Sequence, residues 1–412
     1  MPPHKSLATM SVALTKLAKL IAKHHGIINV CMVDFLTKDI FNNTLECDLK
    51  ISLNQLTEAE ICSLPERFFG VENKSFDHQQ ALDMLVNELR QHTLESLGVV
   101  LSTDSLYSFI ETCEVKTGTN LKHFDKFMSD KKMHEVVAMS DVVDRLCTAH
   151  SVDRIVDLGS GKAYLSQALT ATNKNLHVLA IDSCDINSRS AKNRSERLNK
   201  KWDGLKKRAE VRASGLEPPV RSKHARSKRK NEQNLKNESV EKNLFQNKLK
   251  FVTQFVSTNT DLNALFTEHF EAAKYEQDHY NFNNSPLGLI GLHTCGNLAA
   301  NSINIWKSNK SIQFLCNVGC CYHHIDEEFY RNPYLTNDAS CANVTPTFPL
   351  SSQLKELHYE LGRNARMIAA QPMDRLIANR QLPNKALLWR AILQHILLIH
   401  VPDLHFENQQ VF

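Results

Sequence analysis

The sequence lacks most of the features that mark a membrane, secreted or strongly charged protein. Its 412 residues carry a formal net charge of only +4, so a nucleic-acid signal has to come from local patches. The apolar residues near the start recur at helical spacing between lysines, in a segment too short and too charged to span a bilayer. The eleven cysteines do not have the regular spacing of a secreted disulfide framework. We therefore expect a cytoplasmic or nuclear protein without membrane contact.

What the sequence does contain, between Arg154 and Leu169, is an apolar strand-like run, a glycine turn and a helical pattern in succession. Gly159 and Gly161 would let the backbone approach a ligand closely, beside a helix N-terminus that attracts negative charge. The third glycine of the dinucleotide fingerprint is absent, and the carboxylate of Asp157 precedes the first. A carboxylate there repels a pyrophosphate but suits the amino group of a methionine-type cofactor, which favours S-adenosylmethionine over NAD. Lys162, which follows Gly161, is included in this predicted cofactor site.

A second apolar run, Leu176 to Ile181, ends at Asp182, twenty-five residues after Asp157. An acidic residue at the tip of the second parallel strand can accept hydrogen bonds from ribose hydroxyls. Ser183 lies beside it. Taken singly, the two glycines are as typical of an ordinary strand-to-helix turn as of a cofactor site, and Asp182 is as typical of a helix N-cap as of a ribose-binding acid. Their order and spacing together favour a cofactor site.

Three further strands are predicted after a gap in the pattern, at 250–255, 287–292 and 312–318. The fourth strand delivers the polar run H-T-C-G-N-L at 293–298, and the fifth delivers G-C-C-Y-H-H at 319–324. In an open parallel sheet, ligands bind beyond the carboxyl ends of the strands. Both runs are therefore expected at the same edge as the glycine turn.

Four motifs together carry a family resemblance: M-S-D-K-K-M-H-E-V, D-L-G-S-G-K-A-Y-L-S, G-L-H-T-C-G-N-L-A and V-G-C-C-Y-H-H. From about Lys122 to Ile392 the chain resembles the methyltransferase-like proteins related to the ribosomal RNA adenine dimethylase domain-containing protein. The resemblance implies a Rossmann-like α/β sheet of class I and S-adenosylmethionine as cofactor. The pattern of H-x-C-G followed by C-C-x-H is also similar, more distantly, to tRNA 2′-O-methyltransferases, which favours RNA as substrate.

Two departures from the family pattern qualify what it implies. Ala163 stands where the family usually has a third glycine, which narrows the cofactor turn slightly. The region before Phe412 offers no convincing sixth and seventh strands, and its late apolar run Ile396 to Val401 could equally finish a helix. The sheet is therefore expected to lack its last strands, and the sequence leaves open a truncated or inactive form.

Methyl transfer from a sulfonium is an in-line displacement in which positioning supplies most of the rate. For a hydroxyl acceptor, His293 is the candidate general base, because imidazole titrates near neutrality. For an exocyclic amine, Tyr322 would position the base. The N/D-P-P-Y tetrapeptide of adenine N6-methyltransferases is missing, which argues against that specificity. Lys131 and Lys132 either contact the cofactor carboxylate or a substrate phosphate, or merely begin a solvated helix.

Cys295, Cys320 and Cys321 are predicted to line the substrate side of the site. With nearby histidines they raise a zinc alternative, since zinc prefers four converging nitrogen or sulfur ligands. Adjacent cysteines normally point to opposite faces, however, and the sequence has no C-x-x-C pair. Cysteines packed under the cofactor are therefore preferred, and no metal site is expected.

The predicted organisation is a helical accessory domain and a methyltransferase domain interrupted by a basic disordered insertion. The segments are 1–120 for the helical domain, 121–200 and 249–400 for the two halves of the methyltransferase domain, 203–248 for the insertion and 401–412 for a tail. Between Arg194 and Lys230 there are 14 Lys or Arg against 4 Asp or Glu. Such a stretch either attracts a phosphate backbone or is a solvated linker.

The sequence thus favours an S-adenosylmethionine-dependent methyltransferase acting on RNA. Two alternatives stay open: an inactive protein that keeps the fold to bind RNA or a partner, and a protein methyltransferase.

Overall fold

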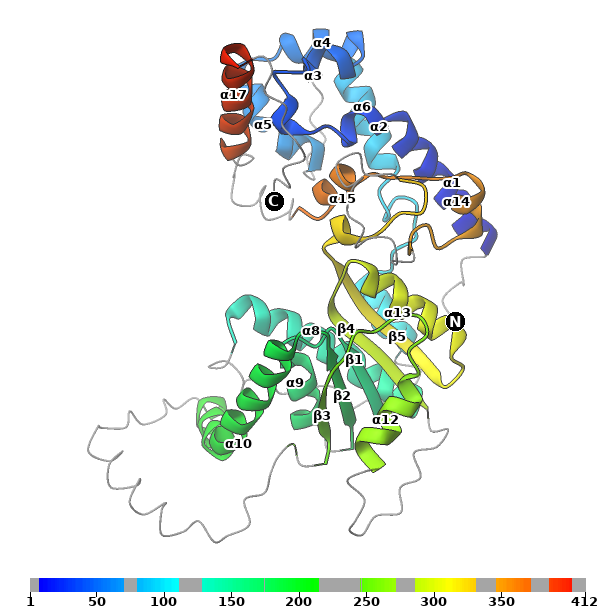
Figure 1. Ribbon diagram of the computed structural model, residues 1–412, viewed down its shortest axis with the longest axis vertical. Helices are drawn as coiled ribbons and strands as arrows, with labels where there is room; N and C mark the ends of the chain where they lie inside the picture. The colour runs from blue at the N-terminus through cyan, green and yellow to red at the C-terminus, as the bar shows by residue number, and fades with distance from the viewer. Residues whose placement is uncertain are drawn as a thin grey trace, which may run out of the picture. The chain divides into compact units, whose positions relative to one another are not determined.

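The computed structural model describes residues 7–69, 80–110, 128–173, 175–214, 245, 247–271, 286–330, 346–371 and 385–401. The chain forms two compact units (Figure 1). The first comprises Met1–Ser105 and Cys321–Phe412, and the second comprises Leu106–Cys320. The segment after Cys320 therefore belongs to the first unit and not to the unit that holds the sheet. The predicted methyltransferase half, 249–400, had included this segment. Side chains tie it to the N-terminal helices instead, as when Asn29 Nδ2 donates a 2.6 Å hydrogen bond to Leu361 O.

The second unit is built on a five-stranded, wholly parallel sheet in the order β3-β2-β1-β4-β5. The strands are β1 (Arg154–Leu158), β2 (His177–Asp182), β3 (Leu249–Thr253), β4 (Leu287–Cys295) and β5 (Ile312–Cys320). This is the strand order of a Rossmann-like sheet, so the predicted α/β fold is confirmed. The late apolar run 396–401 adds no strand, because it lies largely in helix α17 (Lys385–His400).

The strands are buried on both faces, and alternate residues face two separate cores. On β1, Ile155 packs in one core and Val156 in the other, and both are fully buried. The described helices that pack on this sheet are α8 (Asp130–Ala149), α9 (Tyr164–Thr172), α10 (Asp185–Ala213), α12 (Leu262–Glu271) and α13 (Asn297–Ser308). Helices α8, α9 and α10 cover the Ile155 face, and α12 and α13 cover the Val156 face (Figure 1).

Helix α10 enters a segment that was expected to be disordered. It continues to Ala213, within the predicted insertion of 203–248. The stretch G-L-K-K-R-A-E at 204–210 consists mostly of strong helix formers, and this propensity explains the extension. Most of the remaining basic segment, 215–244, lies outside the described residues.

The first unit is helical in its described part, as predicted for the N-terminal region. Its N-terminal elements are α1 (Leu7–Lys23), α2 (His25–Ile28), η1 (Met32–Asp34), α3 (Ile40–Thr44), α4 (Cys47–Asn54), α5 (Glu58–Phe69), α6 (Gln80–Gln91) and α7 (Thr103–Ile110), which crosses the unit boundary. Its C-terminal elements are η3 (Tyr322–His324), α14 (Ser352–Glu356), α15 (Arg363–Ala369) and α17. Among the described residues, none of the helices has both the length and the hydrophobicity that a bilayer span requires.

Candidate functional site

The strand order reverses between β1 and β4, where crossover connections leave in opposite directions. In sheets of this kind the ligand crevice opens at that point, beyond the carboxyl ends of the two strands. The glycine turn follows β1, and Gly159 and Gly161 both have positive φ, +64° and +56°. A Cβ on Gly159 would lie 3.0 Å from Leu298 Cδ2 and 3.6 Å from His293 O, whereas one on Gly161 would meet nothing within 4 Å. The turn therefore packs against the end of β4 on one side and faces open space at Gly161.

Asp182 ties the glycine turn to the tip of β2. Its Oδ2 accepts a 2.8 Å hydrogen bond from Gly161 N, and its Oδ1 accepts bonds from Cys184 N at 2.9 Å and Asn187 Nδ2 at 3.1 Å. These three donors leave acceptor capacity on an ionised carboxylate, which offers about four lone-pair sites. Ser183 and Lys162 are exposed on either side.

Asp157 lies within the sheet rather than in open space. Its exposed fraction is 2%, and its carboxylate accepts a hydrogen bond from the Ser166 hydroxyl of α9. Burial raises the pKa of the Asp157 carboxyl to about 7, although the Ser166 hydrogen bond opposes the shift, and the nearby charge of Asp182 adds to it. The charge of Asp182 thus acts on the buried Asp157 carboxyl, and the predicted role of Asp157 in cofactor binding stays a prediction.

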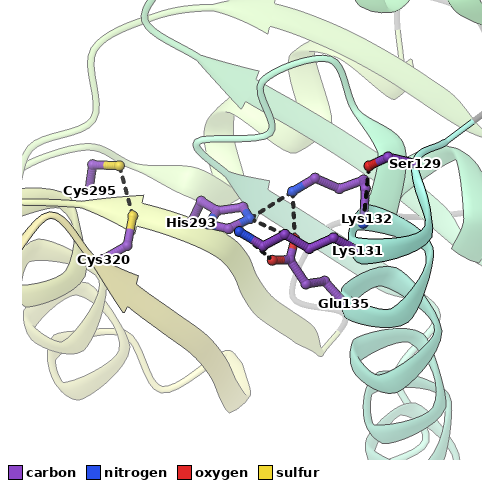
Figure 2. A network of polar contacts seen from close by, with 7 residues as sticks. All are labelled: Ser129, Lys131, Lys132, Glu135, His293, Cys295 and Cys320. Carbon is purple, nitrogen blue, oxygen red and sulfur yellow. Dashed lines mark hydrogen bonds and ion pairs between the residues drawn. The ribbon is translucent and has the colours of Figure 1, made fainter. Parts of the chain in front are cut away.

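His293 occupies an irregular position near the end of β4. Between the paired residues Gly291 and Thr294, β4 has two residues where β5 has one, which is a β-bulge. His293 has φ of +141°, a conformation that costs a non-glycine residue about 1–3 kcal/mol. Bulges beside functional sites redirect side chains, and this one directs the His293 ring toward the first turn of α8 (Figure 2).

In the first two turns of α8, Lys132 and Glu135 contact the His293 ring (Figure 2). Lys132 Nζ lies 2.7 Å from Glu135 Oε2 and 2.7 Å from His293 Nε2, and Glu135 Oε2 lies 3.1 Å from the same Nε2. Lys131 Nζ is 3.8 Å from the other carboxylate oxygen of Glu135. Burial disfavours the Glu135 carboxylate, but its hydrogen bonds with Lys132 and His293 outweigh burial and lower the pKa of the carboxyl below its usual value.

Cys295 and Cys320 are register partners at the ends of β4 and β5. Their Sγ atoms lie 2.9 Å apart (Figure 2). Gly296 N donates a 3.2 Å hydrogen bond to Cys320 O. Thr294, between His293 and Cys295, is fully buried and donates to Asn317 Oδ1. The sequence analysis placed this polar run after the fourth strand. The strand instead continues into this run as far as Cys295, because Thr294 and Cys295 pair with β5.

Two predicted site residues, Cys321 and Tyr322, belong to the other compact unit. Tyr322 is 39% exposed, and its carbonyl accepts a 2.7 Å hydrogen bond from Arg366 Nη1. Arg366 is itself buried in an ion pair with Glu327, which also accepts a 2.9 Å bond from Leu361 N. The described contacts of Tyr322 are thus structural ones within the first unit, and its predicted catalytic role stays a prediction.

The sequence analysis did not identify Glu135 as a site residue. A signal for it existed, since Glu135 follows Lys132 by three positions and Lys131 by four, which places it beside both on one helix face. That spacing predicts only a surface ion pair, of little energetic consequence. The proximity to His293 depends on the fold, because the two residues are 158 positions apart.

Comparisons with known proteins agree with this arrangement. Residues 131–328 match the family model of a methyltransferase domain. Probable methyltransferase-like protein 25 of Mus musculus is 25% identical over 481 aligned residues, which cover 96% of this chain and 79% of that protein. The Homo sapiens protein of the same name is 24% identical over 490 residues, with the same coverage. No solved structure gives a significant match.

The chain therefore contains a methyltransferase domain and is distantly homologous to methyltransferase-like protein 25. This confirms the coarser part of the family resemblance. The matched region includes the glycine turn, Asp182, the Lys132–Glu135–His293 contacts and both of the cysteines Cys295 and Cys320. None of these matches names a substrate.

Proposed function

We propose that the second unit binds S-adenosylmethionine at the glycine turn and catalyses methyl transfer to RNA. The observation that carries the proposal is the hydrogen bond from Gly161 N to Asp182 Oδ2, which joins the turn after β1 to the acid at the tip of β2. A cofactor that spans both strand tips needs these two elements at one edge of the sheet. The methyltransferase domain matched by residues 131–328 supports this proposal.

The residues at this edge fit the proposed cofactor. The open space at Gly161 leaves room beside the turn, since a Cβ there would meet no atom within 4 Å. Asp182 would accept hydrogen bonds from the ribose hydroxyls. Asp157, which is buried two residues before Gly159, would help to position the methionine part. When bound, S-adenosylmethionine supplies an electrophilic methyl group. The chain's own task is then to hold the acceptor in line and to remove its proton.

The choice of RNA as acceptor is supported by helix α10. Its sequence has ten Lys or Arg against four Asp or Glu, an excess of six positive charges. Lys192, Arg197, Lys200 and Lys201 are exposed on it. A basic surface of this kind binds a phosphate backbone by releasing counterions, without reading sequence.

The test combines cofactor binding with transfer of label. Isothermal titration with S-adenosylmethionine should show binding to the wild-type chain, and labelled methyl should enter total RNA rather than total protein. If the label enters the protein pool instead, the substrate is a protein and not RNA. Tight cofactor binding with label in neither pool would favour a binding protein that retains the fold without turnover.

A further inference from the structure

Lys132, Glu135 and His293 lie close together, but they cannot make all of their possible hydrogen bonds at the same time. An ammonium group only donates hydrogen bonds and an ionised carboxylate only accepts them. The three atoms Nζ, Oε2 and Nε2 lie within 2.7–3.1 Å of one another. Nε2 carries either a proton or a lone pair, so it can bond to only one of its two neighbours at a time.

Each protonation state of the ring therefore has a partner already in place. With a lone pair on Nε2, the ring accepts a hydrogen bond from Lys132. With a proton on Nε2, the ring donates to Glu135. Lys132 keeps its 2.7 Å bond to Glu135 Oε2 in both states, so little has to move when the ring gains or loses a proton.

We propose, building on the proposed function, that His293 accepts the proton of a hydroxyl substrate and that Glu135 and Lys132 are the positioning residues that make this possible. Lys132 Nζ donates to Nε2 at 2.7 Å, a distance within the range at which a proton can be transferred. When substrate binds, its hydroxyl group takes the place of the Lys132 ammonium as the donor to Nε2. The substrate oxygen loses its proton to the Nε2 lone pair and uses the freed electron pair to bond the methyl carbon, whose bond to sulfur breaks with its electrons going to sulfur. The imidazolium then donates to Glu135 until solvent takes the proton.

The location of the ring supports this role. The His293 side chain is 43% exposed, so a substrate can reach it, while its carbonyl lies against the glycine turn. The bulge and the positive φ of His293 hold the ring in this direction at a cost to stability. A hydroxyl is the acceptor that gains most from such a base, because it is a poor nucleophile until its proton leaves.

The test is an NMR titration of the His293 ring in the full-length protein without ligand. Glu135→Gln should lower the titration midpoint, because the imidazolium loses its anionic partner. Lys132→Met should raise the midpoint, because a neighbouring positive charge is gone. Shifts of opposite sign are the signature of the contacts of Glu135 and Lys132 with the ring, and the pH–rate profile then tests their role in proton transfer.

The first unit offers a matched control. Glu88 contacts Lys23 Nζ at 2.8 Å and His24 Nε2 at 3.3 Å, so it has the same chemical partners at a distant point in the chain. Glu88→Gln should leave the His293 titration unchanged. In methyl-transfer assays, the acid limb of the pH–rate profile of each site variant should move in the same direction as its His293 titration midpoint. Glu135→Asp should retain most of the rate that Glu135→Gln loses.

The outcomes separate this inference from the proposed function. If the wild type does not bind S-adenosylmethionine, the proposed function fails, and with it the role in methyl transfer. If the cofactor binds but both midpoints stay fixed or move in the same direction, the inference on Glu135 and Lys132 is overturned and the methyltransferase survives. Should Glu135→Gln fail to fold, the midpoint of Lys132→Met decides alone: a rise supports the arrangement, and no change refutes it.

Discussion

The backbone N–H of Gly161 donates a 2.8 Å hydrogen bond to Asp182 Oδ2, and this single contact connects the turn after β1 to the tip of β2. Gly161 has φ of +56°, a conformation that glycine adopts without the strain that a side chain would introduce. Asp182 also accepts the Cys184 N–H at the start of α10. One carboxylate thus holds two turns that flank the proposed cofactor site.

Asp182→Ala should weaken S-adenosylmethionine binding by about 10- to 100-fold, the usual cost of losing a hydrogen bond to a charged group. His293→Ala should keep the affinity within about twofold, because the described contacts of its ring are with Lys132 and Glu135 of α8 (Figure 2). Calorimetric titration measures both. The matched control is Asp261→Ala, since Asp261 Oδ1 also accepts two backbone N–H groups at a helix start, those of Asn263 and Ala264. Equal loss of affinity in the Asp182 and His293 variants would show that the base is misassigned.

Asp157 should make the protein less stable as the pH rises from about 4 to about 7. Its folded pKa of about 7 lies above the ordinary value of 3.8, so the folded chain holds a proton that the unfolded chain has lost in this interval. Asp157→Asn removes the effect and keeps an acceptor for Ser166. The free energy of unfolding is measured with denaturant at pH 5 and pH 8. Between these values the stability of Asp157→Asn should rise relative to that of the wild type, by at most roughly 1.4 kcal/mol for each pH unit below about 7. Parallel changes in both proteins would contradict the buried, protonated carboxyl.

His293→Gly should unfold at higher denaturant concentration than His293→Ala. Glycine ordinarily costs about 0.5–1 kcal/mol relative to alanine within a strand. The φ of +141° at His293 reverses that order, since only glycine adopts it freely. Both variants remove the ring, so both should lose methyl transfer, and their difference in unfolding free energy reports the backbone alone. A more stable alanine variant would mean that the bulge does not strain this residue.

The RNA proposal predicts a change in the salt dependence of binding. Lys192→Glu with Lys200→Glu on α10 should reduce the slope of log K against log salt by about 0.7 for each phosphate that the protein no longer neutralises. Lys16→Glu with Lys19→Glu on α1 makes the same change in net charge at other exposed lysines. That control should leave the slope unchanged. If both pairs weaken binding equally, net charge alone attracts RNA, and α10 is not its binding surface.

The sheet was predictable because parallel strands buried on both faces read as continuous apolar runs. All five residues of β1 are buried. The apolar members of R-I-V-D-L predict this burial, whereas its two charged members do not. Arg154 is tolerated there because its guanidinium lies 4.5 Å from the centroid of the Phe266 ring. The end of α10 was missed because charge density was read as disorder, although lysine, arginine and glutamate are also good helix formers.

The sequence by itself determined the strands, the glycine turn and the acid at the tip of β2, because each depends on residues close together in the chain. Only the tertiary structure decided that Glu135 and Lys132 meet His293 and that Tyr322 belongs to the other unit. Those outcomes depend on strand order and on a bulge that turns one ring. Hydrophobic periodicity specifies which face of an element is buried, but it does not specify which distant side chain lies opposite.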